Sequence, residues 1–226
     1  MIHFHGTPLT PNAQLYKMGG KHFCVSFARP DQIKICLAIG QSVMLDNGAF
    51  SSFTLGKSFN KKKYYDWLDP LLGHPHWAVI PDIIGGSEKE NKESLKDWPF
   101  QKELGSPVWH INLSFDYLSF LIDNYSKVCF GSSGEYWQIG SEKWNRRIDD
   151  AFNYLLSKNK QMPWIHMLRG LSVGGERWPF SSADSTNVAR NFKTLNCDPE
   201  KMARKIDSFN CPIHWEKDES EQMELI

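Results

Sequence analysis

Short apolar runs alternate along this chain with longer amphipathic or charged segments. The β-prone runs, rich in β-branched and aromatic residues, cover residues 2–5, 22–27, 42–45, 77–80, 108–112, 127–130, 164–168 and 180–183. Each run is followed by a polar or glycine-containing break and then by the next amphipathic segment. Strands that alternate with helices in this way are typical of a parallel sheet with helical crossovers.

The segments between the runs carry helical patterns of different kinds. In residues 61–72 and 144–155, apolar side chains recur every three to four positions, with charged residues on the other faces. Residues 87–96 are almost all polar and predict a solvent-exposed helix, whereas residues 116–125 are apolar enough to be largely covered. Residues 199–209 predict a last helix.

Eight strand–helix units in one chain predict an α/β fold, a single (β/α)8 TIM-type barrel. An open doubly wound sheet is the alternative, and it is less favoured because no G-x-G-x-x-G follows the first strand. No linker, fixed-period repeat or low-complexity tract divides the chain, so we expect one domain over residues 1–226. Residues 198–226 form its end, as a C-terminal helix and an acidic tail.

Charge and cysteine content narrow the classes of function. The 26 Lys and Arg residues balance 26 Asp and Glu residues, so a nucleic-acid site would have to be a local patch. The five cysteines contain no C-x-C or C-x-x-C pair, which argues against a zinc knuckle and fits reduced thiols in the cytoplasm. We expect no membrane partner, because no signal peptide or membrane-spanning apolar run is present.

Polar and small residues collect after the predicted strands, where a parallel barrel carries its active site. Three carboxylates stand there, Asp46, Asp82 and Asp184. Asp184 lies in a run of small residues, where it could cap the next helix or act as a nucleophile, base or ligand. Helix capping does not explain the loops at residues 47–50 and 131–134, which suit a flat ligand close to the backbone.

The order of these motifs resembles the tRNA-guanine transglycosylase superfamily, including its relatives that insert deazaguanine bases into DNA. Residues 46–50, Asp-Asn-Gly-Ala-Phe, resemble that family's Asp-Ser-Gly-Gly-Phe loop, and residues 130–135 resemble its Gly-Gly-Leu-Ala-Val-Gly-Glu strand end. Residues 165–170 stand where the family has Tyr-Leu-Met-Gly-Val-Gly, and residues 180–184 where it has a strand ending in its nucleophilic Asp. The family's C-x-C-x-x-C…H zinc site is missing, which argues against tRNA as the substrate.

The resemblance implies chemistry at the N-glycosidic bond of a nucleobase, with DNA favoured over RNA as the nucleic-acid partner. It implies that Asp184 is the nucleophile or stabilises an oxocarbenium ion, Asp46 is the base-contacting acid, and Asp82 is a second base contact or activates water. A DNA glycosylase that flips out and excises a modified base is the first expectation, with defence against phage DNA as its hypothesised role. A transglycosylase that inserts a deazaguanine-type base is the alternative. Neither needs a cofactor.

The substrate-binding residues implied by the same motifs surround the base. Phe50 and Tyr136 would stack on it, and Asn47 would read an exocyclic group. The full expected set is Asn47, Gly48, Phe50, Gly131, Ser132, Ser133, Glu135, Tyr136, His166 and Arg169. The residues expected to contact the nucleic-acid backbone are Arg29, Lys57, Arg177 and Arg190.

A metal-dependent hydrolase is the rival from a different class. His3 and His5 share one side of the first predicted strand, and His110 and Asp184 would complete much of an amidohydrolase-like ligand set. Gly131 and the serines after it stand where such an enzyme would need a further histidine. A non-catalytic nucleic-acid or nucleotide binder is a third interpretation, and the oligomeric state is left open.

Overall fold

The β-prone runs form the strands of one parallel sheet in the computed structural model, which describes residues 1–56 and 58–216. Neighbouring strands pair in the order β5-β4-β3-β2-β1-β9-β8-β7-β6, and every pair is parallel. The strands are β1 (Ile2–Gly6), β2 (His22–Ser26), β3 (Ser42–Asp46), β4 (Trp77–Val79), β5 (Gly105–Ser106), β6 (Val108–His110), β7 (Lys127–Gly131), β8 (Trp164–Met167) and β9 (Ser182–Ser185).

The two ends of this order are consecutive in the chain, because only Pro107 separates β5 from β6. Proline has no backbone N–H and therefore interrupts a strand ladder. On one side β5 pairs with β4, on the other β6 pairs with β7, and the Pro107 carbonyl accepts a hydrogen bond from the Cys129 N–H at 2.9 Å. β5 and β6 are thus two halves of the fifth strand, and the predicted TIM-type barrel is confirmed.

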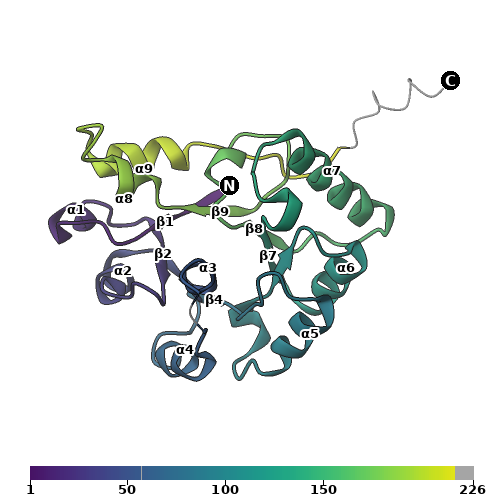
Figure 1. Cartoon of the computed structure of the whole chain (residues 1–226). Helices are drawn as coiled ribbons and strands as arrows, with labels where there is room; N and C mark the ends of the chain where they lie inside the picture. The colour runs from purple at the N-terminus through teal and green to yellow at the C-terminus, as the bar shows by residue number, and fades with distance from the viewer. Residues whose placement is uncertain (57, 217–226) are drawn as a thin grey trace.

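Helices surround the strands as a ring (Figure 1). The α-helices are α1 (Asn12–Tyr16), α2 (Ile33–Ile39), α3 (Ala49–Thr54), α4 (Lys61–Leu68), α5 (Glu88–Lys96), α6 (Phe115–Asn124), α7 (Glu142–Ser157), α8 (Asn187–Asn191) and α9 (Pro199–Asp207). Short 3-10 turns are η1 (Lys102–Leu104), η2 (Gly134–Tyr136) and η3 (Leu171–Val173). No helix in the described ranges is long and apolar enough to cross a membrane.

Polar side chains fix where several of these helices begin. Ser87 forms a capping box with Glu90 at the start of α5, Ser141 accepts from the Trp144 N–H before α7, and Asp198 caps α9. These caps explain why the predicted helices at residues 87–96, 144–155 and 199–209 appear close to their expected positions. The end of the predicted acidic tail, residues 217–226, lies outside the described residues.

Side-chain alternation along the strands separates the barrel interior from the helix-facing layer. The interior cluster contains Phe4, Cys24, Met44, Trp77, Val79, Val108 and Cys129. Two larger clusters fill the space between the sheet and the helices, one beside α6 and α7 and one beside α2, α4, α8 and α9. On β1, Phe4 therefore points into the barrel, and His3 and His5 point outward.

Phe4 anchors the interior layer, because its ring is 5.5 Å from that of Trp77 and 5.8 Å from that of His166, centroid to centroid. We expect Phe4→Ala to lower the free energy of unfolding by about 3–5 kcal/mol, since it leaves a cavity in a closed barrel. Leu156→Ala, at an exposed position of α7, should cost roughly 0.5 kcal/mol or less. Urea unfolding measures both changes, and equal losses would contradict this assignment of the core.

Candidate active site

A pocket of about 600 Å³ opens at the carboxyl ends of the barrel strands. Cys24, Val79 and Val108 belong both to its lining and to the barrel interior cluster, so they close its inner end. The structure brings the three predicted carboxylates together there, since Asp46, Asp82 and Asp184 all line the pocket. They come from the ends of β3, β4 and β9.

Asp184 is held by two donors that bind the same oxygen. Its Oδ1 accepts the backbone N–H of Arg169 at 2.8 Å and lies 3.2 Å from His166 Nε2. Arg169 adopts a left-handed backbone conformation (φ 59°), which is uncommon outside glycine. Within the described contacts, Oδ2 is left as the oxygen available to a substrate.

The expectation that Asp184 could cap the next helix is wrong. The eighth predicted strand is shifted by two residues, so Asp184 lies inside β9, and Thr186 stands at the start of α8. Its carboxylate is committed to Arg169 and His166, across the sheet. These contacts fix the direction of the carboxylate and leave it nearly buried.

His166 lies beneath Asp184 in the barrel interior and is fully buried. The Trp164 indole donates to the Ser182 hydroxyl at 2.6 Å, and that hydroxyl lies 2.8 Å from His166 Nδ1. Because an indole N–H only donates, every donor is used when Ser182 donates to Nδ1 and His166 Nε2–H donates to Asp184. His166 is not among the described lining residues, so its contact with substrate was wrongly predicted and its role is to position Asp184.

Asp82 is fixed from the other side of the pocket by Asn47 and His110. Asn47 Nδ2 donates to Asp82 Oδ1 at 2.8 Å and to the Ile80 carbonyl at 3.2 Å, while its Oδ1 accepts the Ala49 N–H at 2.7 Å. Both amide hydrogens are used inside the protein. The prediction that Asn47 reads an exocyclic group is therefore corrected: it orients Asp82.

His110 Nε2 lies 2.9 Å from Asp82 Oδ2 but without the alignment of a hydrogen bond. Both side chains line the pocket and are almost buried. The contact places an imidazole beside a carboxylate within the same cavity. Sequence reasoning considered His110 only as a metal ligand.

Asp46 has a raised pKa, about 6 instead of 3.8. Burial raises it most, and the negative charges of Asp184 and Asp82 raise it further, whereas hydrogen bonds from Ser26 and the Gly48 N–H act in the opposite direction. Gly48 does not contact the pocket itself. Its φ of 72° turns the chain, and a Cβ there would lie 3.1 Å from Ala28.

Phe50 and Arg169 lie at the mouth of the pocket, as predicted for substrate-binding residues. The Arg169 guanidinium carbon lies 4.1 Å from the centre of the Phe50 ring, and its Nη2 donates to the Ser132 carbonyl at 3.3 Å. Gly131, Ser132 and Ser133 also line the pocket. A Cβ at Gly131 would meet Val108 at 3.0 Å, so the small residue keeps this wall open.

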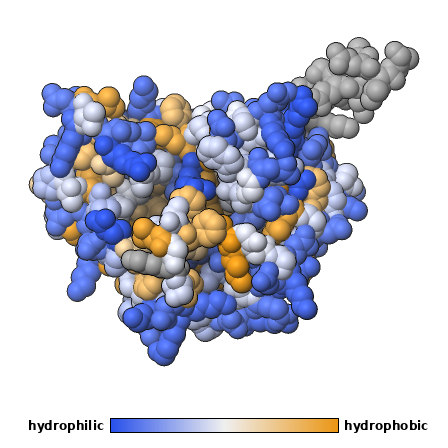
Figure 2. Space-filling view, in the orientation of Figure 1, coloured by the Kyte–Doolittle hydropathy of each residue, from blue (hydrophilic) through white to orange (hydrophobic). Residues whose placement is uncertain are grey.

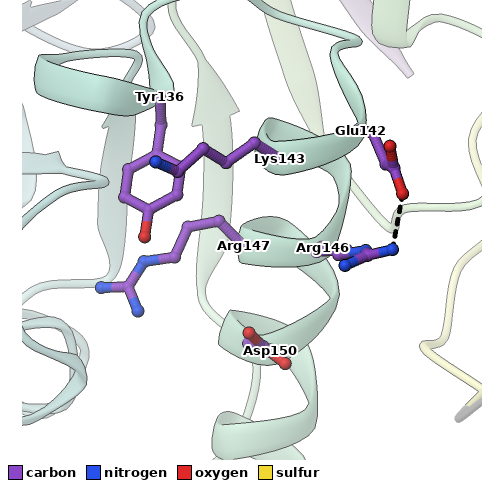
Figure 3. A pocket seen from close by; sticks show the side chains of 6 residues that line it. All are labelled: Tyr136, Glu142, Lys143, Arg146, Arg147 and Asp150. Atoms are coloured by element: carbon purple, nitrogen blue, oxygen red, sulfur yellow. Dashed lines mark hydrogen bonds and ion pairs between the residues drawn. The ribbon is translucent and has the colours of Figure 1, made fainter.

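Glu135 and Tyr136 are not among the described lining residues of the main pocket, so their predicted substrate contacts are corrected. Glu135 pairs with Lys143 of α7. Tyr136 lines a second cavity of about 270 Å³ together with polar side chains of α7, among them Arg146 and Arg147 (Figure 3). The next residue, Trp137, lines the main pocket instead. The sequence predicted that this loop contributes to the site, but it could not show which of two consecutive aromatic residues lines the main pocket.

Of the four cations predicted to hold a nucleic-acid backbone, the three in the described residues do not share one site. Arg29 lines the pocket. Arg177 pairs with Asp149 of α7, and Arg190 is exposed on α8; neither is among the described lining residues. Lys57 lies outside the described residues. Of the predicted backbone-binding cations in the described residues, only Arg29 lines the pocket, and Arg169 also lines it.

The metal-ligand set of the rival hydrolase is not assembled. His3 Nε2 lies 2.8 Å from the Ser185 hydroxyl, and His5 Nε2 lies 2.8 Å from Asp207 of α9. Both rings are on the outer face of β1, whereas His110 and Asp184 face the pocket. Burial lowers the pKa of His3 to about 3. In residues 1–56 and 58–216, no group of three or more His, Cys, Asp or Glu side chains is placed to hold a metal ion.

Comparison with known proteins gives no match to a family model, to a curated protein or to a solved structure. The side chains of the pocket nevertheless define what it can do. Asp46 is protonated up to about pH 6, while Asp184 accepts two hydrogen bonds. An acid and a carboxylate acceptor in one cavity can divide the work of bond cleavage.

We expect a direct titration to show the coupling between these carboxylates. Carboxyl NMR should report a pKa of about 6 for Asp46, and Asp184→Asn should lower it by removing a neighbouring negative charge. Because the folded state holds this proton more tightly than the unfolded chain, stability falls as the pH rises from 3.8 towards 6. An Asp46 pKa near 4, unchanged in the variant, would contradict the arrangement.

Proposed function

We propose that this pocket is the active site of an enzyme that cleaves the N-glycosidic bond of a nucleobase in DNA, excises the base and leaves an abasic site. The observation that supports this most is the pairing of two carboxyl groups in one cavity, where burial raises the pKa of Asp46 to about 6 and Asp184 accepts hydrogen bonds from Arg169 and His166. The motif order along the strands supports a nucleobase as the leaving group.

In the proposed reaction, Asp184 acts at the sugar. Its Oδ2 attacks C1′ or stabilises the oxocarbenium ion that forms there, while His166 and the Arg169 N–H hold Oδ1 in place. Asp46 gives its proton to the base nitrogen as the C1′–N bond breaks and that bond's electron pair moves to the base. A protonated Asp46 suits this step because its pKa is about 6.

Asp82 and His110 supply the second half of the reaction. A water molecule attacks C1′ and transfers its proton to Asp82, which Asn47 holds in position and His110 adjoins. Where Asp184 has bonded to the sugar, the C1′–Oδ2 bond breaks in this step and its electron pair returns to the carboxylate. This base supports hydrolysis over base exchange, since hydrolysis requires only a water. The size of the pocket suits a nucleoside, because small-ligand sites usually enclose about 300–1,000 Å³.

The test uses DNA in several modification states and detects abasic sites by strand scission after alkali. We expect scission with at least one modified DNA, and a loss of at least about a hundredfold in Asp184→Asn. The control is Asp66→Asn, which changes an exposed carboxyl of α4 and should keep full activity. Absence of scission on every DNA, or equal activity in both variants, would contradict the proposal.

The pH dependence carries a second prediction. Because Asp46 must be protonated, kcat/KM should fall above about pH 6, by about tenfold per pH unit, as its carboxyl ionises. Asp46→Asn should remove this descending limb and lower the rate by about 10²–10⁴-fold. The limb is measured on single-turnover cleavage of the same modified DNA. A wild-type rate that rises from pH 6 to 8 would exclude Asp46 as the acid.

A further inference from the structure

We propose that the pocket mouth binds a single nucleic-acid strand, with the bases on either side of the reacting nucleotide stacked on Phe53 and Trp137. This rests on the proposed function only for the nucleotide inside the pocket. The flanking contacts lie outside the catalytic carboxylates and form a separate binding surface.

Both rings are exposed at the rim of a cavity. Phe53 is 58% exposed and Trp137 is 69% exposed, and each also lines the pocket. Single exposed apolar residues are ordinary on protein surfaces, but aromatic rings clustered around one opening mark an interaction site. Figure 2 shows apolar side chains gathered over α3, which carries Phe53, in the middle of this face.

The two rings stand on different sides of the opening. Phe53 follows β3 and Trp137 follows β7, and these strands are three positions apart around the closed barrel of eight. Phe50 and its partner Arg169 also line the opening. A nucleotide that enters the pocket therefore has an aromatic surface available for a neighbouring base on each side.

Two arginines line the same opening. Arg29 follows β2, the neighbour of β3, and Arg169 follows β8, the neighbour of β7, and both line the pocket. Arg29 meets Asp31 at 3.6 Å, but both side chains are 67% exposed. Exposed ion pairs of this kind contribute little stability, so a phosphate can take the place of Asp31.

Exposed aromatic rings and arginines around one opening favour a single nucleic-acid strand as the ligand. Alternating bases and phosphates of a single strand match rings interleaved with arginines, because unpaired bases expose their faces for stacking. A second copy of this chain would bury Arg29 and Arg169 against an apolar α3. An intact duplex keeps its base faces stacked internally and offers none to Phe53 or Trp137.

Binding is measured by fluorescence anisotropy of a fluorescein-labelled single-stranded oligodeoxynucleotide, in the Asp184→Asn background to prevent cleavage. We expect Phe53→Ala and Trp137→Ala each to raise Kd about tenfold, the value of one stacked base. Phe53→Tyr and Trp137→Phe should restore near-original Kd, since an aromatic face remains. Leu195→Ala, equally exposed but outside the described pocket lining, is the matched control and should leave Kd unchanged.

Unchanged Kd in both alanine variants, or tighter binding of the matched duplex than of the single strand, would overturn the inference. So would loss of self-association in Phe53→Ala at constant Kd, because it would assign the patch to a second copy. The inference and the proposed reaction fail separately. If binding depends on the two rings but no abasic sites form, the binding surface is supported and the proposed reaction is rejected. If abasic sites form but binding does not depend on the rings, the reaction is supported and the binding surface is rejected.

Discussion

Three carboxylates share one partly buried cavity, and the arrangement around them follows from the cost of removing charge from water. A buried carboxylate must either accept hydrogen bonds or hold its proton. Asp184 accepts a hydrogen bond from the Arg169 N–H, and Asp82 accepts one from the Asn47 amide. Asp46 has a pKa raised to about 6. The same constraint therefore places three identical side chains in different surroundings within one cavity.

The donors that satisfy this constraint depend on the closed barrel. His166 reaches Asp184 because β8 and β9 are neighbours with Ser182 paired to His166 in register. Its ring packs against both Phe4 and Trp77, which helps to fix the direction of Nε2. Asn47 reaches Asp82 in the same way across β3 and β4. Each catalytic candidate thus has a rigid neighbour on the next strand, which limits its motion before a substrate binds.

The sequence predicted the barrel because apolar runs and amphipathic segments repeat with the periods of strand and helix. It also predicted that Asp46, Asp82 and Asp184 share a mouth, since the topology of a parallel barrel fixes where strands end. The prediction failed where a shift of one or two residues along the chain changes which side chain faces the pocket. The eighth strand shifts by two, and Trp137 replaces Tyr136 at the pocket.

Other errors came from side chains whose partners are distant in the sequence. His3 and His5 lie on the same face of β1, as predicted. Only the packing of Phe4 in the barrel interior shows that this face is the outer one. Asn47 was expected to meet the substrate because it stands in a loop beside Asp46. Two of its three hydrogen bonds, those to Asp82 and Ile80, require β3 and β4 to be neighbours.

The central claim is the division of labour between Asp46 and Asp184, and a substrate with an activated leaving group tests it most directly. A 2-deoxyriboside of 4-nitrophenol releases a stable anion and needs no proton from the enzyme. Asp46→Asn should keep most of the cleavage of this compound while losing that of a nucleobase, and Asp184→Asn should lose both. Equal losses of both substrates in the two variants would contradict the assignment of acid and nucleophile.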